Sequence, residues 1–281
     1  MNHSFHSPSR RLRAARQQGF TLVELAIVLA VIGLIIGAVA IGKDVQRNAE
    51  YTKIKNKFID QWEQAYNQYY QRTGVVLGDN QTAPQNMVNG ANFAGRSGRN
   101  MTTVTAPGTI CDKALGIGMG ARVGDRTDLR VLMTRVGIRM PPGRAEGFED
   151  RYVYLDSNGN PQEVQVCFRW NRPFDASAAA NLVGHGAGNV MVISGLTPDL
   201  ARSLDQMIDG KPDAREGRFR QQNIQNNANS AGGNTGAANA PGSEWHANNR
   251  QAQGAAAAGG GGATLDEDQV ATVVAMYRMN Q

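Results

Sequence analysis

One long run of apolar residues dominates the hydrophobic pattern of the chain. It extends from Phe20 to Gly42, and Glu24 is its only charged residue, so that 18 consecutive residues from Leu25 to Gly42 carry no charge. An apolar stretch of this length crosses the hydrocarbon core of a bilayer as a helix. The sequence therefore predicts a membrane-spanning helix over residues 20–42.

The segment ahead of this run, residues 1–19, is polar and basic. It contains no acidic residue and four arginines: Arg10, Arg11, Arg13 and Arg16. Positive charge beside a span is retained in the cytoplasm. We therefore expect residues 1–19 to lie in the cytoplasm and the chain beyond residue 42 to lie on the other side of the membrane.

Two general interpretations of this N-terminus compete. A secretory signal peptide could be cut after Ala38-Val39-Ala40, but it would be longer than usual and would hold an acid in its apolar core. A plain membrane anchor leaves Glu24 unexplained. A carboxylate inside a membrane span costs several kcal/mol in most estimates and marks a functional site with a partner to be found.

The run Gly19-Phe20-Thr21-Leu22-Val23-Glu24-Leu25 resembles the cleavage and methylation motif of type IV prepilins and pseudopilins. The resemblance implies that a prepilin peptidase cuts after Gly19 and that the new N-terminal residue, Phe20, is N-methylated. It further implies that Glu24 pairs with the N-terminal amine of an adjacent subunit during assembly. Charges that are costly alone in hydrocarbon are tolerable when paired.

The same resemblance predicts location and partners. It implies a single-pass protein of the bacterial inner membrane with its head in the periplasm, which later enters a pilus or pseudopilus. The expected partners are prepilin peptidase and other pilin or pseudopilin subunits. The chain departs from many pilins in one respect: they carry a proline near Ile41, whereas this chain has Gly33, Gly37 and Gly42 instead. Gly33 and Gly37 either form a face on which another helix packs or are glycines of the kind that membrane helices commonly contain.

Beyond Gly42 the sequence becomes charged but keeps a helical stripe of apolar residues. They recur at steps of three and four: Tyr51, Ile54, Phe58, Trp62, Ala65 and Tyr69. Arg72-Thr73-Gly74 is typical of a helix C-terminus. The sequence predicts one helix over residues 20–73, about 80 Å long at 1.5 Å per residue, with its second half packed on a globular head.

The head is expected over residues 74–220, with few elements before residue 150 apart from a short helix around Asp128 to Val136. Strands are predicted at Tyr152–Leu155 and Glu163–Trp170, joined by a turn over residues 156–161. Alternation in the second strand puts Val164, Val166, Phe168 and Trp170 on one face and Cys167 on the other. A third strand, Asn189 to Ser194, precedes a helix that begins near Thr197 and ends at Asp209-Gly210.

The rest of the chain divides into two segments. Residues 221–263 are rich in Asn, Ala, Gly and Gln, which predicts a flexible low-complexity insertion. Residues 264–281 fit either a helix or a strand, and the strand is favoured because pilins usually end in their sheet. The expected fold is thus α+β and pilin-like, with a long N-terminal helix packed on an antiparallel β-sheet head.

Composition adds two points. The whole chain has 29 Lys+Arg against 24 Asp+Glu, but loss of the four leader arginines leaves 25 against 24. The mature chain is therefore nearly neutral. The two cysteines, Cys111 and Cys167, are expected to form a disulfide in an exported protein, with Cys111 on a loop that covers the sheet.

No catalytic cluster, metal site or cofactor motif emerges, so we predict that the protein is not an enzyme and has no cofactor. Gly116–Ala121 resembles a dinucleotide-binding turn but lacks the flanking strand and helix. Asp156, Asn158 and Asn160 have partial calcium-loop spacing, which a hairpin turn explains. Some pseudopilins bind calcium in a C-terminal loop, and the resemblance offers Asp205, Asp209 and Asp213 for such a site, but we expect these three to be solvated turn carboxylates. The four histidines are scattered: His3, His6, His185 and His246.

The sequence therefore predicts a structural subunit, a minor pilin or pseudopilin of a type IV pilus or type II secretion-like filament. A DNA-uptake or adhesive pilin is the alternative. Nucleic acid as a partner is disfavoured, although eight arginines in the first part of the head make it testable: Arg96, Arg99, Arg122, Arg126, Arg130, Arg135, Arg139 and Arg144. An exported enzyme tethered by its helix is a third class, without a catalytic cluster to support it.

Overall fold

The structure is a computed structural model that describes residues 20–93, 95, 101, 104–112, 128–172, 187–222, 245, 250–253 and 264–280. The chain forms two compact units, residues 1–47 and residues 48–281. The leader 1–19 and most of 221–263 lie outside the described residues.

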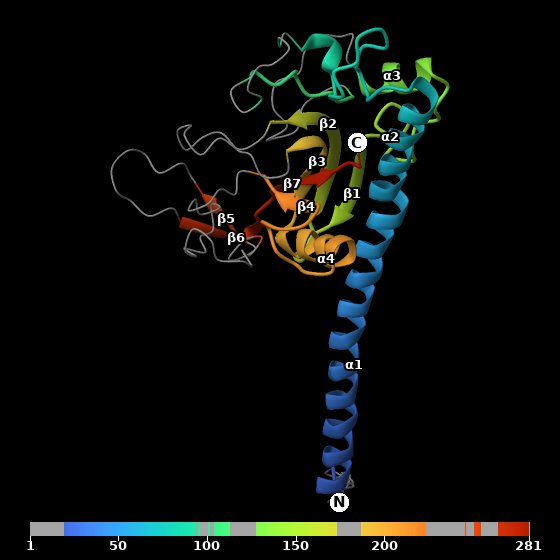
Figure 1. The fold of residues 1–281 in the computed structure, drawn as a ribbon. Helices are drawn as coiled ribbons and strands as arrows, with labels where there is room; N and C mark the ends of the chain where they lie inside the picture. Colours follow the sequence, from blue (N-terminus) through green and yellow to red (C-terminus); the bar gives the residue numbers. More distant parts are fainter. Residues whose placement is uncertain are drawn as a thin grey trace, which may run out of the picture. The chain divides into compact units, whose positions relative to one another are not determined.

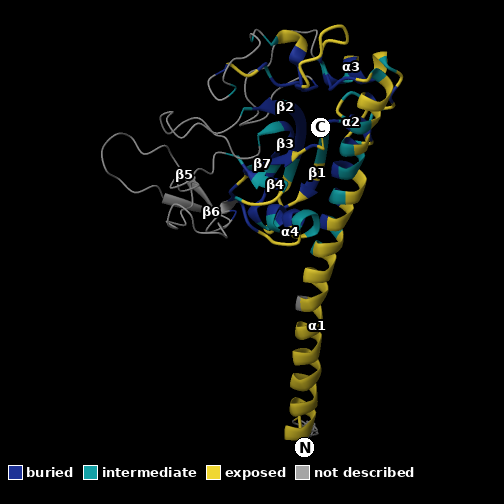
Figure 2. Cartoon of the chain, in the orientation of Figure 1, coloured by how far each residue is buried: buried dark blue, intermediate teal, exposed yellow. Residues whose placement is uncertain are grey.

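In the first unit the described residues form the apolar part of α1 (Leu22–Ile54). Its large apolar side chains are exposed, and Figure 2 shows this stretch of the helix in the colour of exposed residues. The helix from Leu22 to Thr73 contains an 18-residue window of mean hydropathy 2.9, none of it buried by protein. An apolar helix without a protein partner requires a lipid environment or a neighbouring helix to cover it.

The helix continues through a single π-helical turn, η1 (Lys55–Ile59), into α2 (Asp60–Thr73). The sequence predicts an uninterrupted α-helix, so this turn is a correction. A π-turn inserts one residue and rotates the following face, and as a result the adjacent Phe58 and Ile59 are both fully buried. The predicted stripe residues are all buried, and Gly74 ends α2 in the left-handed region at φ 72°.

The second unit contains a five-stranded antiparallel sheet of order β1-β2-β3-β7-β4 (Figure 1). Its strands are β1 (Arg151–Leu155), β2 (Pro161–Asn171), β3 (Gly188–Leu196), β4 (Phe219–Gln221) and β7 (Val273–Arg278). A separate two-stranded sheet pairs β5 (Arg250–Gln253) with β6 (Thr264–Val270). The C-terminal segment thus adopts the strand alternative. The fold is the expected α+β arrangement of a long helix and an antiparallel sheet.

The predicted hairpin is β1 and β2, paired in register from Arg151 with Gln165 to Leu155 with Pro161. The carboxylate of Asp156 holds its turn, because Oδ1 accepts the backbone N–H groups of Asn158 and Asn160 at 2.9 and 2.8 Å. Gly159 has a φ of 85°, which favours glycine. The Asp156 carboxylate thus stabilises the turn of the hairpin. This role explains the spacing of Asp156, Asn158 and Asn160 without a calcium ion.

The main core lies between α2 and one face of the sheet. Phe168 of β2 packs against Trp62 and Tyr66, with ring centroids 6.1 and 5.3 Å apart. Val164 and Val166 belong to the same core, as the alternation predicts. Trp170 instead packs in a smaller cluster with Met87 and Val104.

Three helices complete the described part of the head. The short helix predicted near residue 130 is α3 (Leu129–Arg135), in which the Asp128 side chain accepts the N–H of Arg130. The helix α4 (Pro198–Asp209) begins after Thr197, whose hydroxyl accepts the N–H of Leu200, and it ends at Gly210. A 3₁₀ turn, η2 (Gly90–Asn92), was not predicted.

Candidate functional site

The predicted processing and assembly site lies at the start of α1. Glu24 and Thr21 form a reciprocal cap there. Oε2 of Glu24 accepts the Thr21 backbone N–H at 2.8 Å and its hydroxyl at 2.9 Å, while the Glu24 N–H donates to Thr21 Oγ1 at 3.2 Å. This is the capping box that a Thr-x-x-Glu sequence favours at a helix N-terminus. The carboxylate is therefore held in one orientation at the start of the helix.

Residues 14–40 match the family model described as the prokaryotic N-terminal methylation motif. The chain carries the leader signature of type IV prepilins. No curated protein and no solved structure matches the chain. The prepilin signature supports a type IV pilin-like or pseudopilin-like substrate of prepilin peptidase. It also fits membrane anchoring through the apolar helix.

The three glycines of the apolar helix lie in open space within the described structure. A Cβ built on Gly33, Gly37 or Gly42 meets nothing within 4 Å. No contact in the chain itself therefore requires these glycines. Gly19, the residue predicted to precede the cleaved bond, lies outside the described residues.

The predicted disulfide joins Cys111 and Cys167, with Cα atoms 4.6 Å apart. Both cysteines are fully buried on the sheet face opposite the main core, in a cluster with Val190, Val192 and Met276. The preceding residue, Ile110, forms an isolated antiparallel bridge with Phe168. The bridge and the disulfide attach the 104–112 loop to the second strand, as the sequence predicts.

The prediction that Asp205, Asp209 and Asp213 are solvated turn carboxylates is wrong for two of the three. Asp205 and Asp213 are buried. Oδ2 of Asp205 accepts the indole N–H of Trp245 at 2.8 Å, and Asp213 accepts the backbone N–H groups of Arg215 and Glu216. The reason is that α4 turns Asp205 toward the core, where sequence alone shows only a polar residue near a helix end.

Burial raises the pKa of Asp205 to about 7, aided by the carboxylates of Asp209 and Asp213 and opposed by the Trp245 hydrogen bond. A second buried acid, Asp112, also has a raised pKa, through burial and the nearby Asp150. No pattern in the sequence marks Asp112 or Asp150. Among the described residues, no group of three or more His, Cys, Asp or Glu side chains could hold a metal ion. Gly116–Ala121 and the histidines lie outside the described part of the chain.

The arginines proposed for nucleic-acid binding divide into three groups. Arg130 forms an ion pair with Glu149, and Arg144 pairs with Glu163 at 2.7 Å. Arg135 and Arg139 are exposed. The remaining four, at positions 96, 99, 122 and 126, lie outside the described residues. Acidic partners therefore neutralise two of the four described arginines, which argues against a continuous phosphate-binding stripe on this part of the head.

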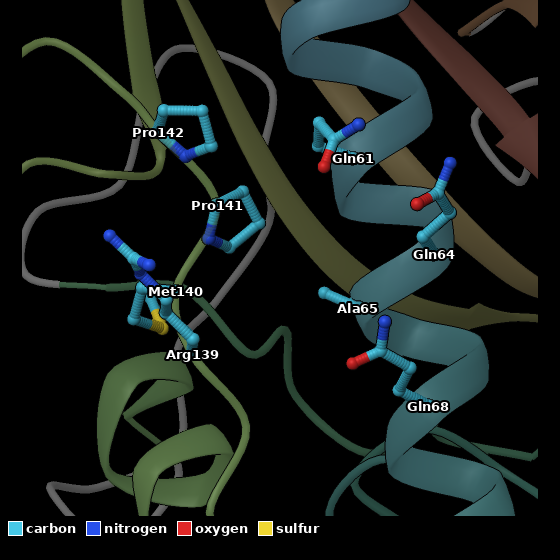
Figure 3. Close-up of a pocket in the computed structure, with 8 residues that line it drawn as sticks. All are labelled: Gln61, Gln64, Ala65, Gln68, Arg139, Met140, Pro141 and Pro142. Carbon is cyan, nitrogen blue, oxygen red and sulfur yellow. The ribbon is translucent and has the colours of Figure 1, made fainter.

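A groove that the sequence did not reveal lies between α2 and the loop 139–142 (Figure 3). It has a volume of about 410 Å³ and combines small or polar residues of the helix with the loop: Gln61, Gln64, Ala65, Gln68, Arg139, Met140, Pro141 and Pro142. Ala65 leaves the space between the longer glutamines open. The only sequence signal for it was the three glutamines at steps of three and four beside the buried stripe.

Proposed function

We propose that the chain is a structural subunit, a minor pilin or pseudopilin, of a type IV pilus or type II secretion-like filament. Prepilin peptidase cuts it after Gly19, Phe20 is N-methylated, and the apolar helix packs with those of other subunits. The observation that carries this proposal is the match of residues 14–40, which include Glu24, to the methylation motif. The large part beyond the helix, residues 74–281, favours a minor subunit or pseudopilin over a compact major pilin.

The electrostatics of the apolar helix support the same role. Leu22, Val23 and Leu25 are exposed around Glu24, so in a membrane this carboxylate would face hydrocarbon or a neighbouring helix. A charge in that setting is costly unless it is paired. The ammonium group that cleavage creates on Phe20 of a neighbour is an opposite charge that can pair with this carboxylate. Pairing the two favours the docked state over the free subunit.

Mass spectrometry of the intact protein purified from its native cells tests the proposal. The expected species begins at N-methylated Phe20 and lacks residues 1–19. A protein that begins at Met1 would show that the peptidase does not process this chain. A protein that begins at Ile41, after Ala40, would have lost Glu24 and would show a secretory signal peptide instead.

A further inference from the structure

The groove beside α2 presents polar groups that the chain itself leaves unused. The side-chain amides of Gln61, Gln64 and Gln68 have no hydrogen-bond partner among the described residues, although they lie along one side of the helix. Each primary amide both donates and accepts, as a peptide group does. From the first to the third, the row covers about 10 Å at 1.5 Å per residue. About three residues of extended chain cover the same length at roughly 3.3 Å each.

The opposite wall does not compete for those amides. Pro141 and Pro142 have no backbone N–H, and Met140 contributes a thioether. None of the described hydrogen bonds joins residues 139–142 to α2. The groove therefore has a hydrogen-bonding side and an apolar side, an arrangement that fits an extended polypeptide segment lying between them.

The groove carries positive charge, which favours an acidic segment as its occupant. Arg139 is exposed and has no carboxylate partner among the described residues, and no acidic residue lines the groove. Arg72 lies next to this loop and donates to the carbonyl oxygens of Val136 and Gly137 at 2.9 and 2.7 Å. Neutral carbonyl groups leave its positive charge uncompensated. An entering carboxylate would therefore be attracted.

The chain contains one segment with matching chemistry. Asp266, Glu267 and Asp268 form the only run of three consecutive acidic residues in the sequence, and they lie in the extended strand β6. This strand pairs with β5 alone in a two-stranded sheet, so its other edge has no strand partner among the described residues. An open strand edge offers backbone donors and acceptors to another surface.

We propose that β6 of a second copy of this chain lies in the groove between α2 and the loop 139–142. Its backbone pairs with the three glutamine amides, and its acids meet Arg139. The groove and the strand are different surfaces of the molecule, so the contact is heterologous. The inference goes beyond the proposed function, because it assigns a contact between heads in addition to the contact between N-terminal helices.

Cysteine cross-linking of the full-length chain in cells tests this contact. Two differently tagged copies are co-expressed, one with Gln64→Cys and one with Asp268→Cys, and a short thiol-reactive cross-linker is added. The expected product is a covalent dimer that carries both tags. Gln206→Cys, at an exposed position on α4 that does not line the groove, replaces Gln64→Cys in the control and should give no such dimer. Cys111 and Cys167 are buried in their disulfide and do not react.

Charge reversal adds a second readout. Arg139→Glu in the Gln64→Cys copy should lower the dimer yield about fivefold, the upper range for an exposed ion pair. Asp266→Lys in the partner copy should restore it. Absence of the dimer while both cysteines accept a thiol label would overturn the proposal, and so would a yield unchanged by Arg139→Glu. A cross-link formed only within one chain that carries both cysteines would also overturn it. The product is scored whether or not a filament forms, so this failure is distinct from a failure of leader processing.

Discussion

Removal of the disulfide between Cys111 and Cys167 should destabilise the head strongly. The bond closes a loop with a sequence separation of 56 residues. In the chain-entropy account, a loop of this length corresponds to roughly 14 cal/mol/K, or about 4 kcal/mol at 25 °C. A domain is usually stable by only about 5–15 kcal/mol. We therefore expect the double variant Cys111→Ala, Cys167→Ala to lose a large share of its free energy of unfolding.

The measurement is urea denaturation of the full-length protein in detergent, followed by the fluorescence of its tryptophans. The midpoint should fall, and reductant should lower the wild-type midpoint but leave the variant unchanged. Alanine suits both positions because the cysteines lie in an apolar cluster with Val190 and Val192, where a serine hydroxyl would be buried without a partner. A loss below about 1 kcal/mol would refute the argument that this bond limits the unfolded chain.

Three further variants test separate parts of the structure. Glu24→Ala should still be cleaved and methylated but should be lost from sheared filaments, as immunoblotting of the filament fraction would show; normal incorporation would contradict the charge-pair role. Asp205→Asn keeps an acceptor for Trp245 but cannot ionise. The folded-state pKa of Asp205 is about 7, so its contribution to stability is full below pH 3.8 and is lost as the pH rises toward 7. The unfolding midpoint of the wild type should therefore fall across that pH range. The midpoint of Asp205→Asn should fall less. Gly195→Ala should misfold or lose several kcal/mol, since Gly195 has a φ of 78° and a Cβ there would lie 2.0 Å from the carbonyl oxygen of Glu163; circular dichroism melting at near-wild-type temperature would contradict this.

The sequence predicted those parts of the fold in which local pattern and tertiary structure agree. The stripe from Tyr51 to Tyr69 buries the face that its spacing indicates, and the hairpin around Gly159 follows its turn residues. The helix after Thr197 begins at its cap and ends at Gly210. In each case residues close together in the sequence specify the element, so the sequence alone is sufficient to predict it.

The features that the sequence missed depend on residues far apart in the chain. The π-turn at Lys55–Ile59 buries both Phe58 and Ile59, and a regular helical period does not predict such a turn. Asp205 looks like a surface acid until Trp245, 40 positions away, covers it and donates a hydrogen bond. The groove beside Ala65 exists only because the loop 139–142 lies opposite α2. Such pairings require the folded topology.

The cap at the start of α1 affects how the Glu24 carboxylate would meet a positively charged partner. Both hydrogen bonds from Thr21 reach the same oxygen of Glu24, Oε2. The other oxygen, Oε1, has no partner among the described residues, so an incoming ammonium group could bind it without breaking the cap. Thr21 would then lower the free-energy cost of the charged Glu24 carboxylate before a neighbouring subunit docks. It would also orient the carboxylate toward the incoming ammonium group. A valine at position 21 would keep the shape of the side chain but remove the hydroxyl, which separates this role from simple packing.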